Sequence, residues 1–327
     1  MPANLSPEYY RAEEELRKAS SAAERLDALK KMLSAIPKHK GTEKMQGDIK
    51  RRIAALREEM QKSGKKKGFS LTVEKEGGGQ VTLAGPPNSG KSRLAATLAG
   101  APLEAAPYPF TTRLPQPAMM PFEDIQIQIV DLPPVCSQHT EFWVPNIIRT
   151  SDLVLLVIDL SSPEVLDELE DTLAVLKQAK IELVHYMPET DYWASVAEKR
   201  GWLVGAKIDL GDAAGNWEVI RELYGGRFGM SAVSSQTGAE IERLRHEIFS
   251  ALEILRVYSK PPGREADMER PYVLPAGSTV LDFASTVHRD FQENLKFARI
   301  WGHGKFEGAR VNRDYVLQDK DVIELHI

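Results

Sequence analysis

The sequence predicts an α/β protein built on a mainly parallel sheet with helices on both faces. Between residues 69 and 259, short apolar segments alternate with segments of helical period, the pattern that right-handed crossover units produce. One segment, 153–159, is continuously apolar, as in strands that are buried on both faces of a sheet. A helical region precedes this domain and a small mixed region follows it. The 327 residues are therefore expected to form more than one domain.

Residues 1–67 are predicted to form a basic helical hairpin. Apolar residues recur three or four positions apart on both sides of Pro37 and Gly41, and Thr42 is the expected N-cap of the second helix. This region holds 17 Lys/Arg against 10 Asp/Glu, a net charge of +7, whereas the rest of the chain carries −12. The uneven charge indicates a polyanionic partner for the hairpin, with a merely solvated helical face as the alternative.

The central domain is assigned to residues 68–259 and the C-terminal domain to residues 270–327, with a linker over 260–269. The strands predicted in the central domain are 80–84, 125–130, 153–159, 202–206 and 227–232. Helices are expected from Lys91, over 163–180 and over 240–258, the last one closing the domain. The C-terminal domain is predicted to be a small α+β unit with a helix near 280–287 and a last strand at 323–327.

Composition narrows the classes of function. The single cysteine, Cys136, excludes an intrachain disulfide and a cysteine-rich metal site, and it fits a reducing compartment. No apolar signal segment opens the chain, and no apolar run is long enough to span a bilayer. We therefore expect a cytoplasmic protein with no membrane partner. The overall net charge of −5 gives no indication of DNA binding.

A glycine-rich segment joins the strand at 80–84 to the helix that begins at Lys91. It consists of Gly85, Pro86, Pro87, Asn88, Ser89, Gly90, Lys91 and Ser92, and it matches a phosphate-binding loop in the required strand–loop–helix context. Backbone N–H groups and the helix N-terminus would enclose phosphates. Lys91 would reach the β and γ oxygens, and the Ser92 hydroxyl would ligate Mg²⁺.

Two further segments match the phosphate side of a GTP site. Phe110, Thr111 and Thr112 lie about twenty residues past the loop, where a switch segment would offer the Thr112 hydroxyl to Mg²⁺. Asp131 ends a predicted strand, in the position of the carboxylate that lies near the ion. Ser92, Thr112 and Asp131 are therefore the predicted metal-binding residues.

Two later segments match the base side of such a site. Ala206, Lys207 and Asp209 follow a strand, so the Asp209 carboxylate could accept from N1–H and the exocyclic amine of guanine while the Lys207 stem covers the ring. Ser231 and Ala232 follow the next strand, where a backbone N–H can meet the guanine carbonyl. Because ligands of open α/β sheets bind at the carboxyl ends of strands, all four segments are expected at one site.

These motifs together resemble the Obg-related GTPases, and most closely their developmentally regulated GTP-binding (DRG) branch. The resemblance rests on the run Tyr108-Pro109-Phe110-Thr111-Thr112, the phosphate loop and segment 206–209. Residues 270–327 are similar to a TGS domain, a ubiquitin-like β-grasp module, through segments 274–280 and 298–302. The resemblance implies a P-loop G domain and a GTP-hydrolysing switch with Lys91 and Thr112 as catalytic residues. It also implies association with the ribosome or rRNA and a protein partner at the hairpin or the TGS domain.

Two residues depart from the family pattern. The family motif that begins at Asp131 ends in a glycine whose N–H reaches the γ-phosphate, but this chain has Pro134, which lacks an N–H and has a fixed φ. The base-binding motif of the family begins with Asn, whereas Ala206 cannot brace the base and the phosphate loop. One lost charge-assisted hydrogen bond is worth roughly 1.5–3 kcal/mol, or about ten- to hundredfold in affinity. We therefore expect weaker nucleotide binding and a damped switch.

Three functional hypotheses stay open at this point. The first is a slow GTPase, because Val135 stands where many GTPases have a water-orienting Gln. Relatives with this trait and an Asn in the loop, here Asn88, are similar to GTPases that use K⁺. The second is a degenerate scaffold that binds nucleotide, or none, and docks on the ribosome or a protein. The third, a P-loop kinase or ATPase, leaves Asp209 unexplained. Asp159, at a strand end, is expected to cap the following turn.

Overall fold

The computed structural model describes residues 9, 22–36, 42, 46–47, 49–51, 53, 72–101, 115–186, 196–302 and 308–327. The chain forms two compact units, Met1–Ser70 and Leu71–Ile327. In the first unit, helix α2 (Ala22–Ala35) contributes to an apolar cluster that also includes residues from beyond Gly41. Its buried members are Tyr9, Leu29, Met32, Ile36, Ile49 and Ile53. Much of the predicted hairpin lies outside the described residues, so the hairpin as a whole stays a prediction.

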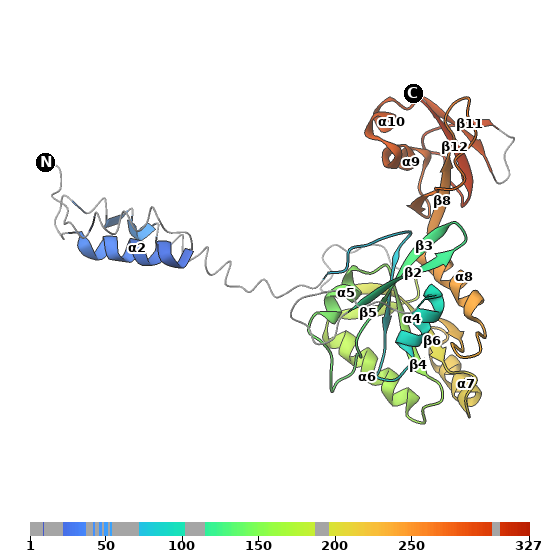
Figure 1. Ribbon diagram of the computed structural model, residues 1–327, viewed down its shortest axis with the longest axis horizontal. Coiled ribbons are helices and arrows are strands. Elements are labelled where there is room, and N and C mark those ends of the chain that lie inside the picture. The colour runs from blue at the N-terminus through green and yellow to red at the C-terminus, as the bar shows by residue number, and fades with distance from the viewer. Residues whose placement is uncertain are drawn as a thin grey trace. The chain divides into compact units, whose positions relative to one another are not determined.

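The second unit contains an α/β domain whose sheet has seven strands within the described residues (Figure 1). The order is β2-β3-β1-β4-β6-β5, and β7 pairs with β6. Strand β2 is antiparallel to β3, and the other pairings are parallel, as predicted. The strands are β1 Gln80–Ala84, β2 Gln116–Phe122, β3 Ile125–Asp131, β4 Leu153–Asp159, β5 Ile181–Val184, β6 Ala197–Ala206 and β7 Gly229–Ala232.

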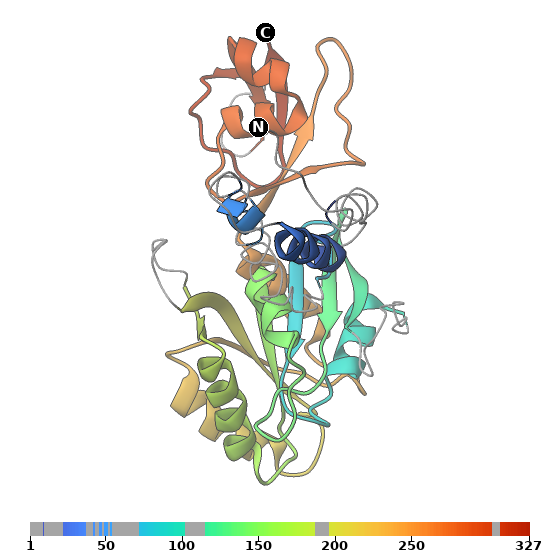
Figure 2. The ribbon, with the colours of Figure 1, turned by 90° about the vertical axis from the view of Figure 1, so that its left-hand side faces the viewer.

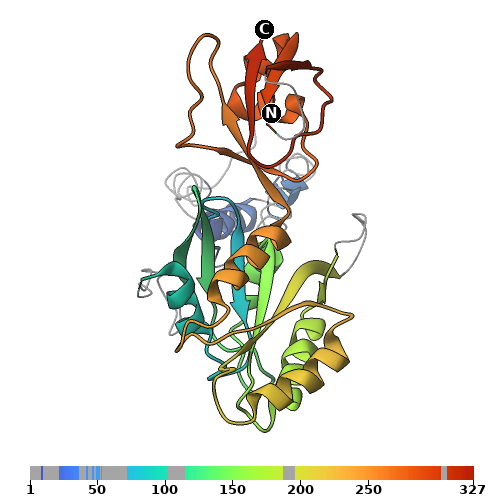
Figure 3. The ribbon, with the colours of Figure 1, turned by 90° about the vertical axis from the view of Figure 1, so that its right-hand side faces the viewer.

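Helices cover both faces of this sheet, which confirms the predicted layering. Figure 2 faces the side that carries α5 (Val144–Thr150) and α6 (Val165–Gln178). Figure 3 faces the side with α4 (Lys91–Ala99) and α8 (Ile241–Leu252). Helix α7 (Ala213–Tyr224) contributes Ala213 and Ile220 to the same core as α5 and α6.

Strand β4 belongs to both cores, as its continuous apolar sequence predicts. Leu153, Leu155 and Val157 face the core that includes α4 and α8. The alternate residues, Val154, Leu156 and Ile158, face the core that includes α5 and α6. Because side chains of a strand point to opposite faces in turn, an unbroken apolar strand can only be satisfied by cover on both sides.

The C-terminal part has its own sheet, in the order β11-β10-β12-β8-β9. Its helix α9 (Val280–Val287) begins with a capping box between Thr279 and Asp282, and Phe283 is fully buried in the core. The other elements are β8 Ile254–Ser259, β9 Tyr272–Pro275, α10 Arg289–Asn294, β10 Phe297–Trp301, β11 Ala309–Val311 and β12 Asp321–His326. Among the described residues, no helix has the length and apolar character to cross a bilayer.

The helix predicted over 240–258 is wrong in its second half. Helix α8 ends at Leu252, Glu253 adopts a left-handed conformation with φ of +49°, and β8 begins at Ile254. Leu255 and Val257 then enter the core of the second sheet. Apolar residues in this stretch alternate with a period of two, as in a strand, although Ile248 to Leu255 keep helical spacing. Strand β8 pairs with both β9 and β12.

A buried arginine of β8 connects the second sheet to the turn between β2 and β3. Arg256 is 2% exposed, and its Nη1 donates to Glu123 Oε2 at 2.7 Å and to Asp124 Oδ1 at 2.6 Å. Its Nε and Nη2 donate to the two carboxylate oxygens of Asp319, at 3.0 and 2.7 Å. Hydrogen bonds from Lys320 and Arg256 lower the pKa of Glu123 to about 2. One guanidinium thus binds three carboxylates from two turns of the chain.

Candidate nucleotide-binding site

The loop after β1 requires glycine at two positions. Gly85 has a φ of +149°, and a Cβ built there would lie 2.1 Å from the carbonyl oxygen of Val157 on β4. Gly90 has a φ of +95° and is followed directly by helix α4. The chain can therefore pass close to β4 and turn into the helix only with these residues, and the backbone of the loop stays open to a ligand.

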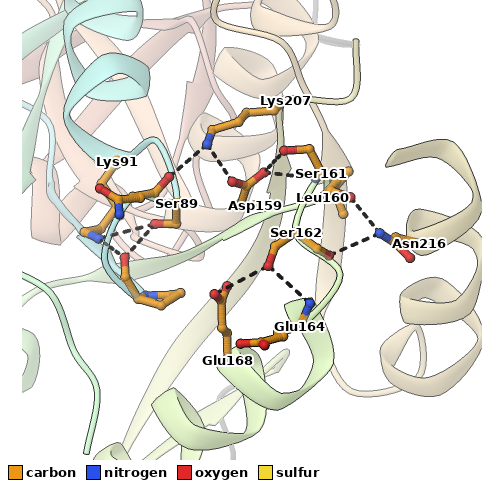
Figure 4. Close-up of polar contacts among 12 residues, drawn as sticks. Ser89, Lys91, Asp159, Leu160, Ser161, Ser162, Glu164, Glu168, Lys207 and Asn216 are labelled. Atoms are coloured by element: carbon orange, nitrogen blue, oxygen red, sulfur yellow. Dashed lines mark hydrogen bonds and ion pairs between the residues drawn. The ribbon is translucent and has the colours of Figure 1, made fainter. Parts of the chain in front are cut away.

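Lys91 turns back over this loop. Its Nζ donates to the carbonyl oxygens of Gly85 at 3.0 Å and Pro86 at 2.6 Å. It also donates to Ser89 Oγ at 3.3 Å (Figure 4). Burial lowers the pKa of Lys91 to about 8, and the nearby Asp131 carboxylate opposes this shift. The ammonium is held inside the loop where a phosphate would favour its charged form.

Ser92 and Asp131 come together below the loop. Ser92 Oγ donates to Asp131 Oδ2 at 2.5 Å, while Asp131 Oδ1 is buried and has no hydrogen-bond partner within the described part of the chain. Burial raises the pKa of Asp131, although Ser92 and Lys91 counteract it. A hydroxyl and an unpartnered carboxylate oxygen are ligands that suit Mg²⁺, so these two residues fit the predicted metal site.

The backbone after Asp131 is tied down on both sides. The N–H of Val135 donates to the carbonyl oxygen of Gly85 at 3.0 Å, and the hydroxyl of Thr172 on α6 donates to the carbonyl oxygen of Val135 at 2.9 Å. The Val135 side chain is fully buried, and Pro134 beside it is half-buried. The segment that would sense the γ-phosphate is thus hydrogen-bonded to the phosphate loop.

The predicted base side lies at the ends of β4 and β6. Lys207, with a left-handed φ of +61°, donates from Nζ to the carbonyl oxygen of Asn88 at 3.0 Å and pairs with Asp159 Oδ2 at 2.5 Å (Figure 4). Asp209 is exposed and has no hydrogen-bond or ion-pair partner among the described residues. A cavity of about 330 Å³, a size suited to a small ligand, lies beside it. Its walls include Gly90, Arg93, Ala206, Lys207, Asp209, Leu210, Ser235 and Gln236.

Ser231 and Ala232 do not line this cavity. They line another one, of about 410 Å³, and the Ser231 hydroxyl accepts from Trp202 Nε1 at 2.7 Å and donates to Glu247. The strand end that does reach the base side lies a few residues later, at Ser235 and Gln236. A polar turn after the strand, in which Ser234 Oγ accepts from the N–H groups of residues 236 and 237, is the signal that could have indicated them.

Asp159 caps its turn as expected. Its Oδ1 accepts from the N–H of Ser161 at 2.9 Å and from the Ser161 hydroxyl at 2.6 Å. The same carboxylate also pairs with Lys207, a contact that the sequence analysis did not anticipate. Phe110, Thr111 and Thr112 lie outside the described residues, so their role stays a prediction.

Comparison with known proteins identifies both halves of the second unit. Residues 80–187 match a family model described as a 50S ribosome-binding GTPase, and residues 255–327 match the TGS domain. A GTP-binding protein of Methanocaldococcus jannaschii is 27% identical, over 93% of this chain and 92% of its own. Developmentally-regulated G-protein 1 of Arabidopsis thaliana is 28% identical, over 92% and 90%. Ribosome-interacting GTPase 1 of Saccharomyces cerevisiae is 24% identical, over 94% and 99%.

The chain is similar to the DRG GTP-binding proteins over most of its length. This agrees with the fold, because the DRG-like chain has a P-loop G domain followed by a separate TGS sheet. The similarity also agrees with a guanine nucleotide as ligand and with Mg²⁺ as the metal, which the contact between Ser92 and Asp131 fits. When bound, the ion would neutralise phosphate charge; the chain itself contributes the loop amides and the Lys91 ammonium.

Proposed function

We propose that this DRG-like protein recognises guanine through Asp209. The observation that carries the proposal is an exposed carboxylate, without a partner among the described residues, beside a cavity that Gly90 of the phosphate loop also lines. Such a carboxylate accepts from N1–H and the exocyclic amine of guanine, whereas adenine offers no matching pair of donors. The stem of Lys207, which bridges to the loop at Asn88, would cover one face of the base.

We further propose slow GTP hydrolysis. Lys91 would stabilise charge on the transferred phosphoryl group, and Thr112 would complete the metal site with Ser92 and Asp131. Val135 is buried and apolar, so it cannot orient a water molecule. We propose that hydrolysis requires K⁺ and that Asn88 in the loop helps to bind it. The ion would supply the missing positive charge.

The proposed partner is the ribosome or its RNA. Two facts support it: the net charge of +7 over residues 1–67, and the similarity to the yeast protein named Ribosome-interacting GTPase 1. Binding through phosphate contacts loses affinity steeply with salt. Co-sedimentation with ribosomes should therefore weaken as KCl rises. A salt-independent interaction would contradict docking by the basic region.

One observation favours a second candidate, a nucleotide-binding scaffold without a switch. Pro134 offers no N–H to a γ-phosphate, and Val135 is hydrogen-bonded to Gly85 and Thr172. A segment already tied to the loop has little left to order when GTP binds. In that case the protein would dock on its partner in one conformation, whichever nucleotide is present.

Single-turnover hydrolysis of GTP and ATP in K⁺ buffer tests both candidates. The GTPase proposal predicts slow cleavage of GTP, none of ATP, and loss of activity in Lys91→Ala. The scaffold proposal predicts no cleavage until Pro134→Gly and Ala206→Asn restore the family residues. Equal binding of GTP and ATP would contradict the role given to Asp209, and Asp209→Asn should reduce the preference for guanine about tenfold or more.

A further inference from the structure

The ammonium of Lys207 is held by two acceptors of different kinds. One is the neutral carbonyl oxygen of Asn88 in the phosphate loop, at 3.0 Å, and the other is the Asp159 carboxylate at the end of β4, at 2.5 Å. Figure 4 shows the Lys207 ammonium beside the Asp159 carboxylate. Lys207 is 33% exposed and Asp159 is 15% exposed, so the ion pair is partly shielded from water.

The register of the sheet brings this pair together. Asp159 lies opposite Ala206 in the parallel β4–β6 ladder, and the N–H of Leu160 donates to the carbonyl oxygen of Ala206 at 3.0 Å. The next residue, Lys207, then leaves the strand in a left-handed conformation. A carboxylate at position 159 is therefore placed beside the lysine by adjacent strand ends, independently of any ligand.

The hydrogen bond between Lys207 and Asn88 matters more because its neighbour is Ala206 and not a polar residue that could also bind the loop. Its methyl side chain is buried and can form no hydrogen bond to the phosphate loop. Among the described residues, the hydrogen bond between Lys207 and Asn88 is what joins segment 206–210 to segment 85–92. Lys207 thus adds a direct hydrogen-bonded link between two segments that the β1–β4–β6 pairing already holds in one sheet.

We propose that Asp159 is a positioning residue for nucleotide binding. It fixes the Lys207 ammonium against the phosphate loop and so holds the lysine stem over the base. Segments 206–210 and 85–92 then keep the spacing that the nucleotide needs. The inference rests on the proposed guanine-nucleotide site and adds a residue outside its motifs. Asp159 acts through Lys207 and touches no ligand itself, and its contacts with Ser161 are a separate, structural role.

Three variants separate these roles. Asp159→Asn keeps a carbonyl oxygen for Ser161 but places no negative charge beside Lys207. Ser161→Ala removes one contact of the turn and keeps the ion pair. Lys207→Met keeps an apolar stem over the base and removes the ammonium. The measurements are the dissociation rate of a fluorescent GDP analogue from the full chain, and the melting temperature with and without GDP.

We expect Asp159→Asn to speed GDP dissociation about tenfold or more, the effect of losing one charge-assisted hydrogen bond. Ser161→Ala should stay within about twofold of the natural chain. Asp159→Asn combined with Lys207→Met should be no faster than Lys207→Met alone, because both act on one link. The GDP-induced rise in melting temperature should fall in Asp159→Asn, whereas a purely structural role would lower the melting temperature and leave that rise unchanged.

Three results would overturn the inference, and they differ in whether the guanine-nucleotide proposal fails with it. Suppose that the natural chain binds GDP, that GDP leaves Asp159→Asn at the natural rate, and that it leaves Lys207→Met faster. Lys207 then needs no carboxylate, and the inference alone is wrong. If GDP neither binds nor raises the melting temperature of the natural chain, the guanine-nucleotide proposal fails and the inference fails with it. Additive effects in the double variant would also contradict a shared link.

Discussion

Replacing Arg256 with Leu should destabilise the chain more than any surface ion pair could. The guanidinium is 2% exposed and serves Glu123, Asp124 and Asp319. Removing one partner of a buried ion pair costs about 3–5 kcal/mol because the remaining charges lose their compensation. Here the carboxylates keep 43, 23 and 34% exposure, so water can partly solvate them. We therefore expect a loss of about 3 kcal/mol in the free energy of unfolding.

Urea unfolding at several pH values measures this effect and its origin. Because the folded-state pKa of Glu123 is lowered from 4.5 to about 2, the associated stability is present above about pH 4.5 and is lost as the pH falls toward 2. The difference between the natural chain and Arg256→Leu should shrink over the same window. Arg289→Leu is the matched control, because its pair with Glu293 is 84% exposed on the arginine side, and it should cost less than about 0.5 kcal/mol. A loss below about 1 kcal/mol at neutral pH, or one that persists unchanged in acid, would refute the reasoning.

Three further predictions concern the nucleotide site. In the nucleotide-free chain, burial lowers the pKa of Lys91 from 10.5 to about 8, so between these pH values the unfolded state binds more protons than the folded state. The free energy of unfolding should therefore rise with pH in this window. Urea titrations should show this rise in the natural chain and not in Lys91→Met. Gly85→Ala should abolish GDP binding and lower the melting temperature, because its Cβ would lie 2.1 Å from the carbonyl oxygen of Val157. Gly215→Ala is the control, because Gly215 lies in α7 with open space around it. It should leave GDP binding intact and stabilise the chain by about 0.5–1 kcal/mol. GTP hydrolysis should be faster in K⁺ than in Na⁺ at equal ionic strength, and identical rates would remove the role proposed for Asn88.

Much of the fold follows from local pattern. The continuous apolar run at 153–159 required cover on both faces, and β4 has it. The boundary near 253 was missed because Ile248, Leu252 and Leu255 keep helical spacing across it. What ends the helix is the left-handed Glu253 and the pairing of β8 with two strands that come later in the chain. Pairing partners that are distant in sequence leave no mark on local periodicity.

The candidate site likewise has contacts that local sequence predicts and contacts that it does not. The loop around Lys91 and the contact between Ser92 and Asp131 were predictable, because they depend on a strand–loop–helix motif and on one strand end. The pair of Lys207 with Asp159 was not, since it depends on which strands are neighbours and in what register. Ser231 was assigned to the base side because it follows a strand, but the chain runs on before it turns toward the cavity at Ser235.

Strand β8 has a consequence for how the chain can be divided. Only Glu253 separates it from α8, and it lies between β12 and β9 in the second sheet, with Leu255 and Val257 in that core. A fragment that starts at residue 270, after the proline-rich stretch, would lack an interior strand and leave β12 with an unpaired edge. A fragment that starts at residue 254 would keep the sheet whole. The two domains are therefore modules that must be separated or exchanged at Glu253, and the apparent linker at 260–269 lies within the second module.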